Sequence, residues 1–311
     1  MAGRRSLVRA LGVWVNGLRA GEWRIPARGD MELTYDEAWH ASAEGRPLSL
    51  SLPFALDHAP LKGRAVENYF DNLLPDAEPI RRRLRERFRL TTRDTFDLLA
   101  AIGRDCIGAV QLLDADAAPP NIETIESKTL TETQVAALLR DTAADAALNT
   151  IANNEPFRLS LAGAQEKTAL LRHKNRWHLP LNTTPTTHIF KLPLGEVGGR
   201  RLDLSTSIEN EWLCAQILRA YGLPVAQCEM AVFDDQKVLI VERFDRQLHA
   251  SGRYWLRLVQ EDFCQATGTP SASKYEADGG PGIIDIARIL RGSVNRDGDL
   301  RCIVKIGRAH V

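Results

Sequence analysis

The N-terminal part of the chain alternates short apolar runs with turn residues. Residues 13–15 and 18–23 are largely apolar and flank Asn16-Gly17. Because Asn-Gly accepts the positive φ angles of a type I′ turn, this stretch predicts a β-hairpin. Alternating apolar positions predict further strands over residues 33–35 and 48–52. The chain is therefore expected to open with β structure.

Helical periodicity follows Pro75-Asp76, where Ile80, Leu84 and Phe88 recur every four positions. Two interpretations of this predicted helix stay open: a solvated amphipathic helix, or a surface that binds phosphate or a partner. The other faces of the helix are filled by arginines: Arg81, Arg82, Arg83, Arg85, Arg87 and Arg89. A second helix is predicted over residues 96–102, with Thr92 as a candidate N-cap and Gly103 at its end.

The pattern changes after residues 114–127, which have little apolar periodicity and are predicted to be a linker. Thr131 and Gln134 have the spacing of a capping box, so a short helix is predicted from Thr131 to Asp141. Two more helices are predicted, over residues 207–221 and 283–291. Strand-like runs are predicted at residues 159–161, 168–171, 188–192 and 238–241, and the helix over residues 207–221 lies between the third and the fourth run. Strands arranged around one helix are typical of the N-terminal lobe of a kinase-like fold.

Composition narrows the class of protein. The 311 residues suffice for two compact domains, and 44% hydrophobic with 26% charged residues is typical of a globular protein. The formal net charge is zero, so no global field favours nucleic acid or membrane, although a local patch could. No apolar run has the length of a membrane span, and the N-terminus lacks the apolar core of a signal peptide, so a cytoplasmic location is expected. Five cysteines without a Cys-x-x-Cys pair indicate reduced, buried thiols: Cys106, Cys214, Cys228, Cys264 and Cys302.

Small residues at 162–164 suggest a phosphate loop. Gly163 stands between Ala162 and Ala164, so backbone N–H groups can approach phosphate oxygens, and Lys167 could supply a cation. The motif departs from a P-loop, because Glu166 occupies the place of the second glycine before Lys167-Thr168. A P-loop hydrolase is therefore disfavoured, and a plain turn between strands stays open.

Two further positions carry candidate chemistry. Lys191 lies inside an apolar strand, where a buried charge needs an anion; nucleotide phosphates and a glutamate of the next helix, at 209 or 211, would supply one. An edge-strand lysine that reaches solvent is the alternative. Glu242 and Phe244 follow the apolar strand 238–241 and could form a hinge that bonds and packs against adenine. The alternative there is a strand that ends in surface ion pairs among Arg243, Asp245 and Arg246.

Taken together, these segments resemble the HipA family of type II toxin–antitoxin kinases, from about residue 10 to about residue 290. Six segments carry the resemblance, in order: residues 68–76 (NYFDNLLPD), 162–170 (AGAQEKTAL), 187–195 (THIFKLPLG), 241–246 (VERFDR), 260–264 (QEDFC) and 274–282 (KYEADGGPG). Each segment alone would be weak, whereas all six in order are specific.

The resemblance implies a serine/threonine protein kinase that uses ATP and Mg²⁺. Its targets would include aminoacyl-tRNA synthetases, notably the glutamyl enzyme, and their phosphorylation would arrest translation and produce dormancy. It also implies a HipB-like antitoxin as partner, operator DNA bound indirectly through that antitoxin, and no membrane. Ser160 falls on the autophosphorylated serine, Lys191 on an ATP-contacting lysine, and Glu242 with Phe244 on the adenine hinge. The phosphate loop falls on Ala162, Gly163, Ala164, Gln165, Glu166, Lys167 and Thr168.

The expected fold class is α+β. A β-rich and helical N-terminal domain (residues 1–113) is followed by a linker with a short helix (114–150). A partial kinase domain (151–298) would contain a protein-kinase-like nucleotide lobe and the start of a helical C-terminal lobe. The last six residues resemble a sequencing adapter translated as protein, so residues 299–311 are interpreted as a non-native tail.

The chain departs from the family at its C-terminal end. Phosphoryl transfer needs an aspartate beside the attacking hydroxyl and a metal-binding Asn or Asp. The family supplies these in an Asp-x-x-x-x-Asn loop, and no asparagine lies five residues after Asp297, Asp299 or Asp245. We therefore expect an incomplete kinase, inactive as given and without catalytic or metal-binding residues. The alternative is a non-catalytic module that binds the antitoxin.

Overall fold

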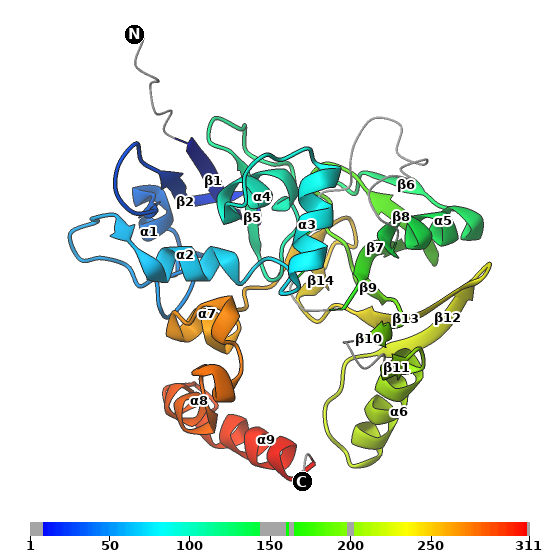
Figure 1. The fold of residues 1–311 in the computed structure, drawn as a ribbon. Coiled ribbons are helices and arrows are strands. Elements are labelled where there is room, and N and C mark those ends of the chain that lie inside the picture. The colour runs from blue at the N-terminus through cyan, green and yellow to red at the C-terminus, as the bar shows by residue number, and fades with distance from the viewer. Residues whose placement is uncertain (1–8, 144–159, 162–164, 198–201, 310–311) are drawn as a thin grey trace.

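The computed structural model describes residues 9–143, 160–161, 165–197 and 202–309. An antiparallel sheet opens the fold, with strand order β4-β3-β2-β1-β5 (Figure 1). Its strands are β1 (Arg9–Val15), β2 (Leu18–Ile25), β3 (Glu32–Tyr35), β4 (Leu61–Lys62) and β5 (Val110–Asp114). The predicted hairpin is confirmed: β1 pairs with β2, and the turn residues Asn16 and Gly17 have φ angles of 44° and 84°.

Helices α1 (Glu37–Ala41), α2 (Arg64–Asp71), α3 (Glu78–Arg87) and α4 (Thr95–Ile102) complete the N-terminal domain. Its core centres on Trp23, which stacks on Phe70 at 3.9 Å between ring centroids and also contacts Phe96. Both predicted helices are confirmed, with Gly103 at the end of α4. The predicted cap is wrong, because Asp94 and not Thr92 occupies the N-cap position.

The predicted strand over residues 48–52 is wrong, because these residues form bends and a turn. The alternating serine and leucine residues instead contact segments that are distant in the sequence. Ser51 donates to the carbonyl of Gln265 at 2.6 Å, and Tyr35 donates to the carbonyl of Leu52 at 2.7 Å. Hydrogen bonds to distant segments thus replace those of a sheet.

A second sheet has the order β12-β13-β9-β7-β8-β6. Its strands are β6 (Ser127–Thr129), β7 (Lys167–His173), β8 (Arg176–Pro180), β9 (His188–Lys191), β12 (Cys228–Phe233) and β13 (Gln236–Glu242). The predicted runs at 168–171, 188–192 and 238–241 are thereby confirmed, whereas Ser160 and Leu161 are not in a strand. The fold class α+β is also confirmed.

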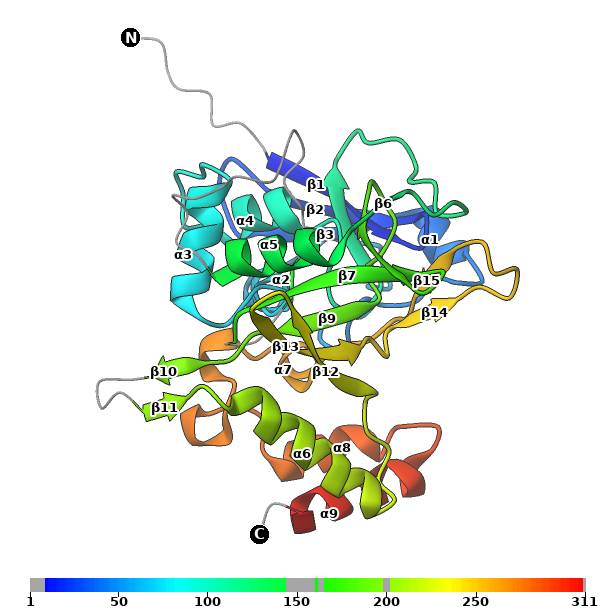
Figure 2. The same cartoon turned by 90° about the vertical axis from the view of Figure 1, so that its right-hand side faces the viewer.

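Two helices cover opposite faces of this second sheet, α5 (Glu132–Ala143) and α6 (Ser207–Ala220) (Figures 1 and 2). The predicted capping box of α5 is present, since Gln134 N–H donates to Thr131 Oγ1 and Thr131 N–H donates to Gln134 Oε1. Helix α5 packs Val135, Ala136 and Leu139 against the sheet. A short ribbon, β10 (Gly195–Val197) with β11 (Leu202–Leu204), precedes α6.

The C-terminal segment contains β14 (Arg246–Leu248), β15 (Trp255–Arg257), α7 (Phe263–Thr267), α8 (Ile283–Leu290) and α9 (Arg296–Ala309). Helix α8 confirms the helix predicted over residues 283–291. The assignment of residues 299–311 as a non-native tail stays a prediction, as do the other domain boundaries. None of the helices within the described residues combines the length and apolar character needed to cross a bilayer.

Helix α2 fastens the C-terminal segment to the N-terminal domain. Asn68 Nδ2 donates to the carbonyl of Gly268 at 2.7 Å, and Asn72 Nδ2 donates to the carbonyl of Thr269 at 2.9 Å. Asp71 accepts a hydrogen bond from the hydroxyl of Ser271. These contacts fix the position of the residues that follow, including Lys274.

The expectation of buried thiols holds for two of the four cysteines whose side chains are described. Cys106 and Cys264 are buried, Cys228 is half-buried and Cys214 is exposed. All four are free thiols.

Candidate functional site

Two lysines lie side by side on the sheet face that α6 covers. In the antiparallel pairing of β7 with β9, Lys167 is directly opposite Lys191, and Lys191 is opposite Leu239 of β13. Directly opposed residues point to the same face of a sheet. Strand β9 lies between β13 and β7, so the edge-strand interpretation of Lys191 is wrong.

Helix α6 supplies an anion for each of two strand lysines. Lys191 forms an ion pair with Glu211, and Lys237 of β13 forms one with Glu209. The side chain of Lys191 is 24% exposed, against 48% for Lys237. Of the two glutamates proposed from the sequence for Lys191, Glu211 is therefore the partner.

A third lysine approaches from the C-terminal segment. Lys274 Nζ lies 2.9 Å from Asp76 Oδ2 of the N-terminal domain, and this bond raises the pKa of Lys274 against the opposing effect of burial. Burial and then Lys191 lower the pKa of Lys167 to about 8, with a smaller lowering by Lys274 and an opposing effect of Asp76. Lys167, Lys191 and Lys274 thus influence one another electrostatically and are called the lysine cluster below. Three ammonium groups gathered in this way favour the binding of anions.

The segment before Lys167 is held against β9 and α3. Gln165 Nε2 donates to the carbonyl of Leu192 at 2.6 Å, and Leu192 N–H donates to the carbonyl of Glu166 at 3.1 Å. Glu166 also forms an ion pair with Arg83 of the arginine-rich helix α3. Ala162, Gly163 and Ala164 lie outside the described residues, so the phosphate loop itself stays a prediction.

Helix α3 is not simply solvated, because several of its arginines have partners within the chain. Arg81 donates to Asp71 at 2.8 Å, and Arg85 pairs with Glu78 while only 10% of its side chain is exposed. The Arg85–Glu78 pair lies within α3, whereas Arg81 and Arg83 use the basic face of α3 to hold neighbouring segments.

Two predicted site residues, Thr168 and Ser160, are buried. Thr168 is opposite Phe190 and faces the core beneath α5, with 5% of its surface exposed. Ser160 is fully buried against the N-terminal domain, where its hydroxyl donates to the carbonyl of Leu73 at 2.7 Å. Its role as a phosphorylated serine stays a prediction.

The predicted hinge begins where β13 ends. Glu242 is opposite His188, so its side chain lies on the opposite face of the sheet from Lys191. There it lines a cavity of about 290 Å³ with Arg172, His188 and Glu229 among others. Any contact of Glu242 with a ligand beside Lys191 must therefore use its carbonyl, because its N–H donates to the carbonyl of Gln227 at 2.9 Å. Phe244 is 75% exposed, and its ring is available for stacking.

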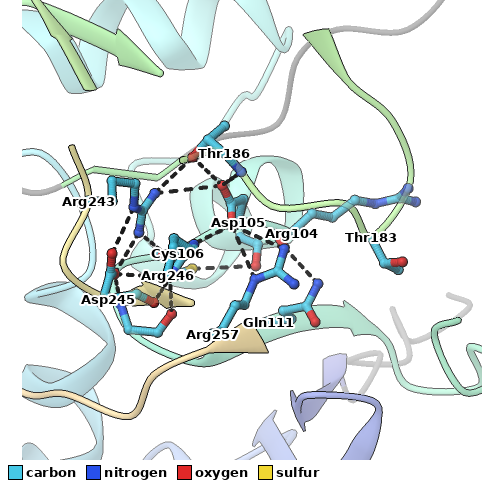
Figure 3. A network of polar contacts seen from close by, with 12 residues as sticks. Arg104, Asp105, Cys106, Gln111, Thr183, Thr186, Arg243, Asp245, Arg246 and Arg257 are labelled. Carbon is cyan, nitrogen blue, oxygen red and sulfur yellow. Dashed lines mark hydrogen bonds and ion pairs between the residues drawn. The ribbon is translucent and has the colours of Figure 1, made fainter. Parts of the chain in front are cut away.

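The charged residues around Phe244 are buried, so the surface ion-pair interpretation is wrong. Figure 3 shows Arg243, Asp245 and Arg246 in one network with Asp105 of the N-terminal domain. Arg243 binds Asp245 through two hydrogen bonds, of 2.9 and 2.7 Å. The hinge is consequently a rigidly anchored segment with one projecting aromatic side chain.

No group of three His, Cys, Asp or Glu side chains gathers to hold a metal ion within the described part of the chain. We assign no metal ligand and no step that requires one.

The arrangement suits a nucleoside polyphosphate. The lysine cluster offers cations to a phosphate chain on the α6 face of the sheet. Leu239 and Val241 lie on that same face and lead to the hinge, where backbone groups and an exposed aromatic ring suit a purine base.

Comparison with known proteins identifies the family. The family model of the HipA N-terminal domain matches residues 11–113, and that of the HipA-like C-terminal domain matches residues 159–306. The chain belongs to the HipA family.

Two HipA-family relatives match nearly the whole chain. The putative kinase Y4mE of Sinorhizobium fredii is 35% identical over 91% of this chain, and the serine/threonine-protein kinase toxin HipA of Shewanella oneidensis is 28% identical over 90% of it. The chain spans 65% and 60% of the lengths of these two relatives.

A solved structure shares the HipA fold. It is described as the Shewanella oneidensis MR-1 toxin–antitoxin system HipA, HipB and its operator DNA complex. It superposes with a TM-score of 0.74, is 24% identical in sequence, and the match covers 96% of this chain and 68% of that one.

Sequence reasoning missed several residues that build the site. Asp76 and Lys274 lie in segments that carry the HipA resemblance. Asp76 ends its segment and Lys274 begins the other, and these charged end positions could have drawn attention to both residues. Asp105 and Arg257 were missed entirely. Their contact spans 152 positions, so no local pattern announces it.

Proposed function

We propose that this HipA-family chain binds ATP between the lysine cluster and the hinge, as the nucleotide-binding part of a serine/threonine protein kinase. The observation that carries the proposal is the ion pair of Lys191 with Glu211 of α6, beside Lys167. In kinases a strand lysine paired with a helix glutamate holds the nucleotide phosphates. The kinase names of the two relatives add support.

Each part of the ATP molecule has a proposed partner. Lys167 and Lys191 neutralise phosphate oxygens, as would the loop of Ala162, Gly163 and Ala164. The backbone carbonyl of Glu242 accepts a hydrogen bond from adenine while Phe244 packs against the base. Mg²⁺ would enter with the nucleotide, and Ser160 is the serine that the family resemblance marks for autophosphorylation.

The proposed substrate of the kinase is a translation-related protein such as an aminoacyl-tRNA synthetase, in particular the glutamyl enzyme. The proposed partner is a HipB-like antitoxin, through which the chain would reach operator DNA. The name of the HipA–HipB–operator complex supports these partners. Because the 311 residues contain no Asp-x-x-x-x-Asn loop after the hinge, we propose that they bind nucleotide without transferring phosphate.

The test combines binding and transfer. The 311-residue chain is titrated with Mg-ATP while its melting temperature is recorded, and is then incubated with ATP labelled at the γ-phosphate. We expect a saturable rise in melting temperature without incorporation of label. No rise would contradict nucleotide binding, and label on Ser160 would contradict the proposed lack of transfer.

The second candidate is a non-catalytic module that binds the antitoxin. The structural match to a HipA that was solved with HipB and DNA favours it. Co-purification with a helix-turn-helix antitoxin, together with no response to nucleotide, would support this alternative against the first.

A further inference from the structure

A buried charged network ties the hinge to the N-terminal domain. It joins the loop after α4 to the residues on both sides of Phe244 and to β15 (Figure 3). Its charged members are each at most 7% exposed in their side chains: Asp105, Arg243, Asp245, Arg246 and Arg257. Three cations and two anions out of contact with water can persist only with nearly complete pairing.

Asp105 is the central anion of this network. Its Oδ1 accepts hydrogen bonds from Arg246 at 3.0 Å and from Arg257 at 3.1 and 3.2 Å. Its Oδ2 accepts from the backbone N–H and the hydroxyl of Thr186 at 3.0 and 2.7 Å, and lies 3.6 Å from Arg243. Burial alone would raise the pKa of Asp105, but the three arginines outweigh it and hold the pKa well below its ordinary value.

The loop that carries Asp105 also grips the hinge through its backbone. The carbonyl of Cys106 accepts from Arg243 at 2.9 Å and from Arg246 at 2.8 Å. The N–H of Gly108 donates to Asp245 at 2.8 Å. Both residues that flank Phe244 are thereby fixed, while the Phe244 ring itself is left exposed.

We propose that Asp105 is a positioning residue for nucleotide binding: from the N-terminal domain, it holds the hinge backbone and the Phe244 ring where adenine is recognised. The inference rests on the proposed nucleotide site and extends it. In a kinase-like lobe the strand and the hinge would suffice to place the base. Here the hinge is anchored by Asp105 of the N-terminal domain. The affinity for adenine therefore depends on contact between the two domains.

The charge balance explains why Asp105 and not another residue has this role. Without Asp105, Asp245 would remain as the only carboxylate of the network to face three buried guanidinium groups. Arginine stays charged in proteins, so the excess charge can be relieved only by movement of the hinge or of β15. The lysine cluster belongs to β7, β9 and the segment of Lys274, and would keep its own pairing.

Two probes separate base recognition from phosphate binding. Adenosine reports on the hinge, and inorganic tripolyphosphate reports on the lysine cluster. Calorimetry measures the binding of each probe to the wild-type 311-residue chain and to the variants Asp105→Asn and Thr186→Val. Thr186→Val is the milder change, because it removes only a hydroxyl bonded to Asp105 and Arg243. Glu32→Gln is the matched control, because Glu32 of β3 is a buried carboxylate of the N-terminal domain that pairs with Arg24 and Lys62.

We expect Asp105→Asn to weaken adenosine binding at least tenfold and Thr186→Val to weaken it severalfold, with tripolyphosphate binding within twofold of wild type in both. Glu32→Gln should change neither. A purely structural role would instead reduce binding of both probes together, in proportion to the folded fraction. Hydrogen exchange should also accelerate at residues 243–246 in Thr186→Val.

Each outcome is decisive. If wild type binds neither probe, the proposed nucleotide site is wrong, and this inference with it. If wild type binds adenosine and the folded variants bind it equally well, the site stands and the positioning role of Asp105 is refuted. If Asp105→Asn does not fold, Thr186→Val decides between these results through its adenosine affinity and its hydrogen exchange.

Discussion

Replacing Lys191 by methionine, which has a similar length and no charge, tests the phosphate-binding role of the lysine cluster. The structure provides a matched control in Lys237→Met. Lys191 and Lys237 both extend from the α6 face of the sheet, and each pairs with a glutamate of α6. Only Lys191 stands opposite Lys167 in the proposed phosphate site.

The expected magnitude follows from the environment of each pair. Both ion pairs are partly exposed, with side-chain exposures of 24% and 40% for Lys191–Glu211 and 48% and 33% for Lys237–Glu209. Solvent-screened pairs contribute less than about 1 kcal/mol to the free energy of unfolding, so both variants should fold. A hydrogen bond from an ammonium group to phosphate contributes about 1.5–3 kcal/mol, which corresponds to roughly 10- to 150-fold in the dissociation constant.

Isothermal calorimetry with Mg-ATP at constant ionic strength measures this difference. We expect Lys191→Met to weaken ATP binding by roughly 10- to 150-fold and Lys237→Met by less than about twofold. Adenosine binding should change in neither variant. Equal losses of ATP affinity in both variants, or unchanged affinity in Lys191→Met, would refute the assignment of the phosphate site.

Three other outcomes follow from the structure. The pKa of Lys167 is lowered from 10.5 to about 8, so below pH 8 its buried charge opposes folding, and this penalty is relieved as pH rises from about 8 to 10.5. Bound triphosphate favours the charged form of Lys167, so ATP binding above pH 8 should take up a proton and should weaken as pH rises. Calorimetry in two buffers of different ionisation enthalpy measures this proton uptake. The variant Lys167→Arg should abolish it. Asn72→Leu leaves the carbonyl of Thr269 unpaired, which should lower the free energy of unfolding by about 1–3 kcal/mol and speed proteolysis near residues 268–282. An unchanged cleavage rate would contradict the fastening role of α2. Gly17→Ala should lower the free energy of unfolding by roughly 1 kcal/mol in urea denaturation because φ is +84° at this position.

Elements with local signals could be predicted from the sequence. The hairpin at Asn16-Gly17, the helices α3 to α6 and the strands β7, β9 and β13 all have periodic apolar residues or explicit capping and turn residues. The alternation at residues 48–52 misled, because its serines bond to the distant residues Glu261 and Gln265 instead of forming a sheet. The local sequence pattern cannot distinguish an alternating strand from an alternating loop whose polar side chains bond to distant residues.

The candidate site was predictable only in part. Lys191 and its glutamate partner were accessible because a charge in an apolar strand requires an anion. The burial of Arg243, Asp245 and Arg246 was not, since their partner Asp105 lies about 140 positions earlier in the chain. The orientation of Glu242 away from Lys191 follows from strand register, which the sequence alone left undefined.

Photoaffinity labelling with 8-azido-ATP tests the central claim most directly, since the reactive group is on the adenine ring. The 311-residue chain is irradiated with the probe, digested, and the labelled peptides are identified by mass spectrometry. The account predicts saturable labelling within residues 239–246 that excess ATP abolishes and that Lys191→Met diminishes. Labelling confined to other surfaces, or labelling at the hinge that ATP does not compete away, would contradict it.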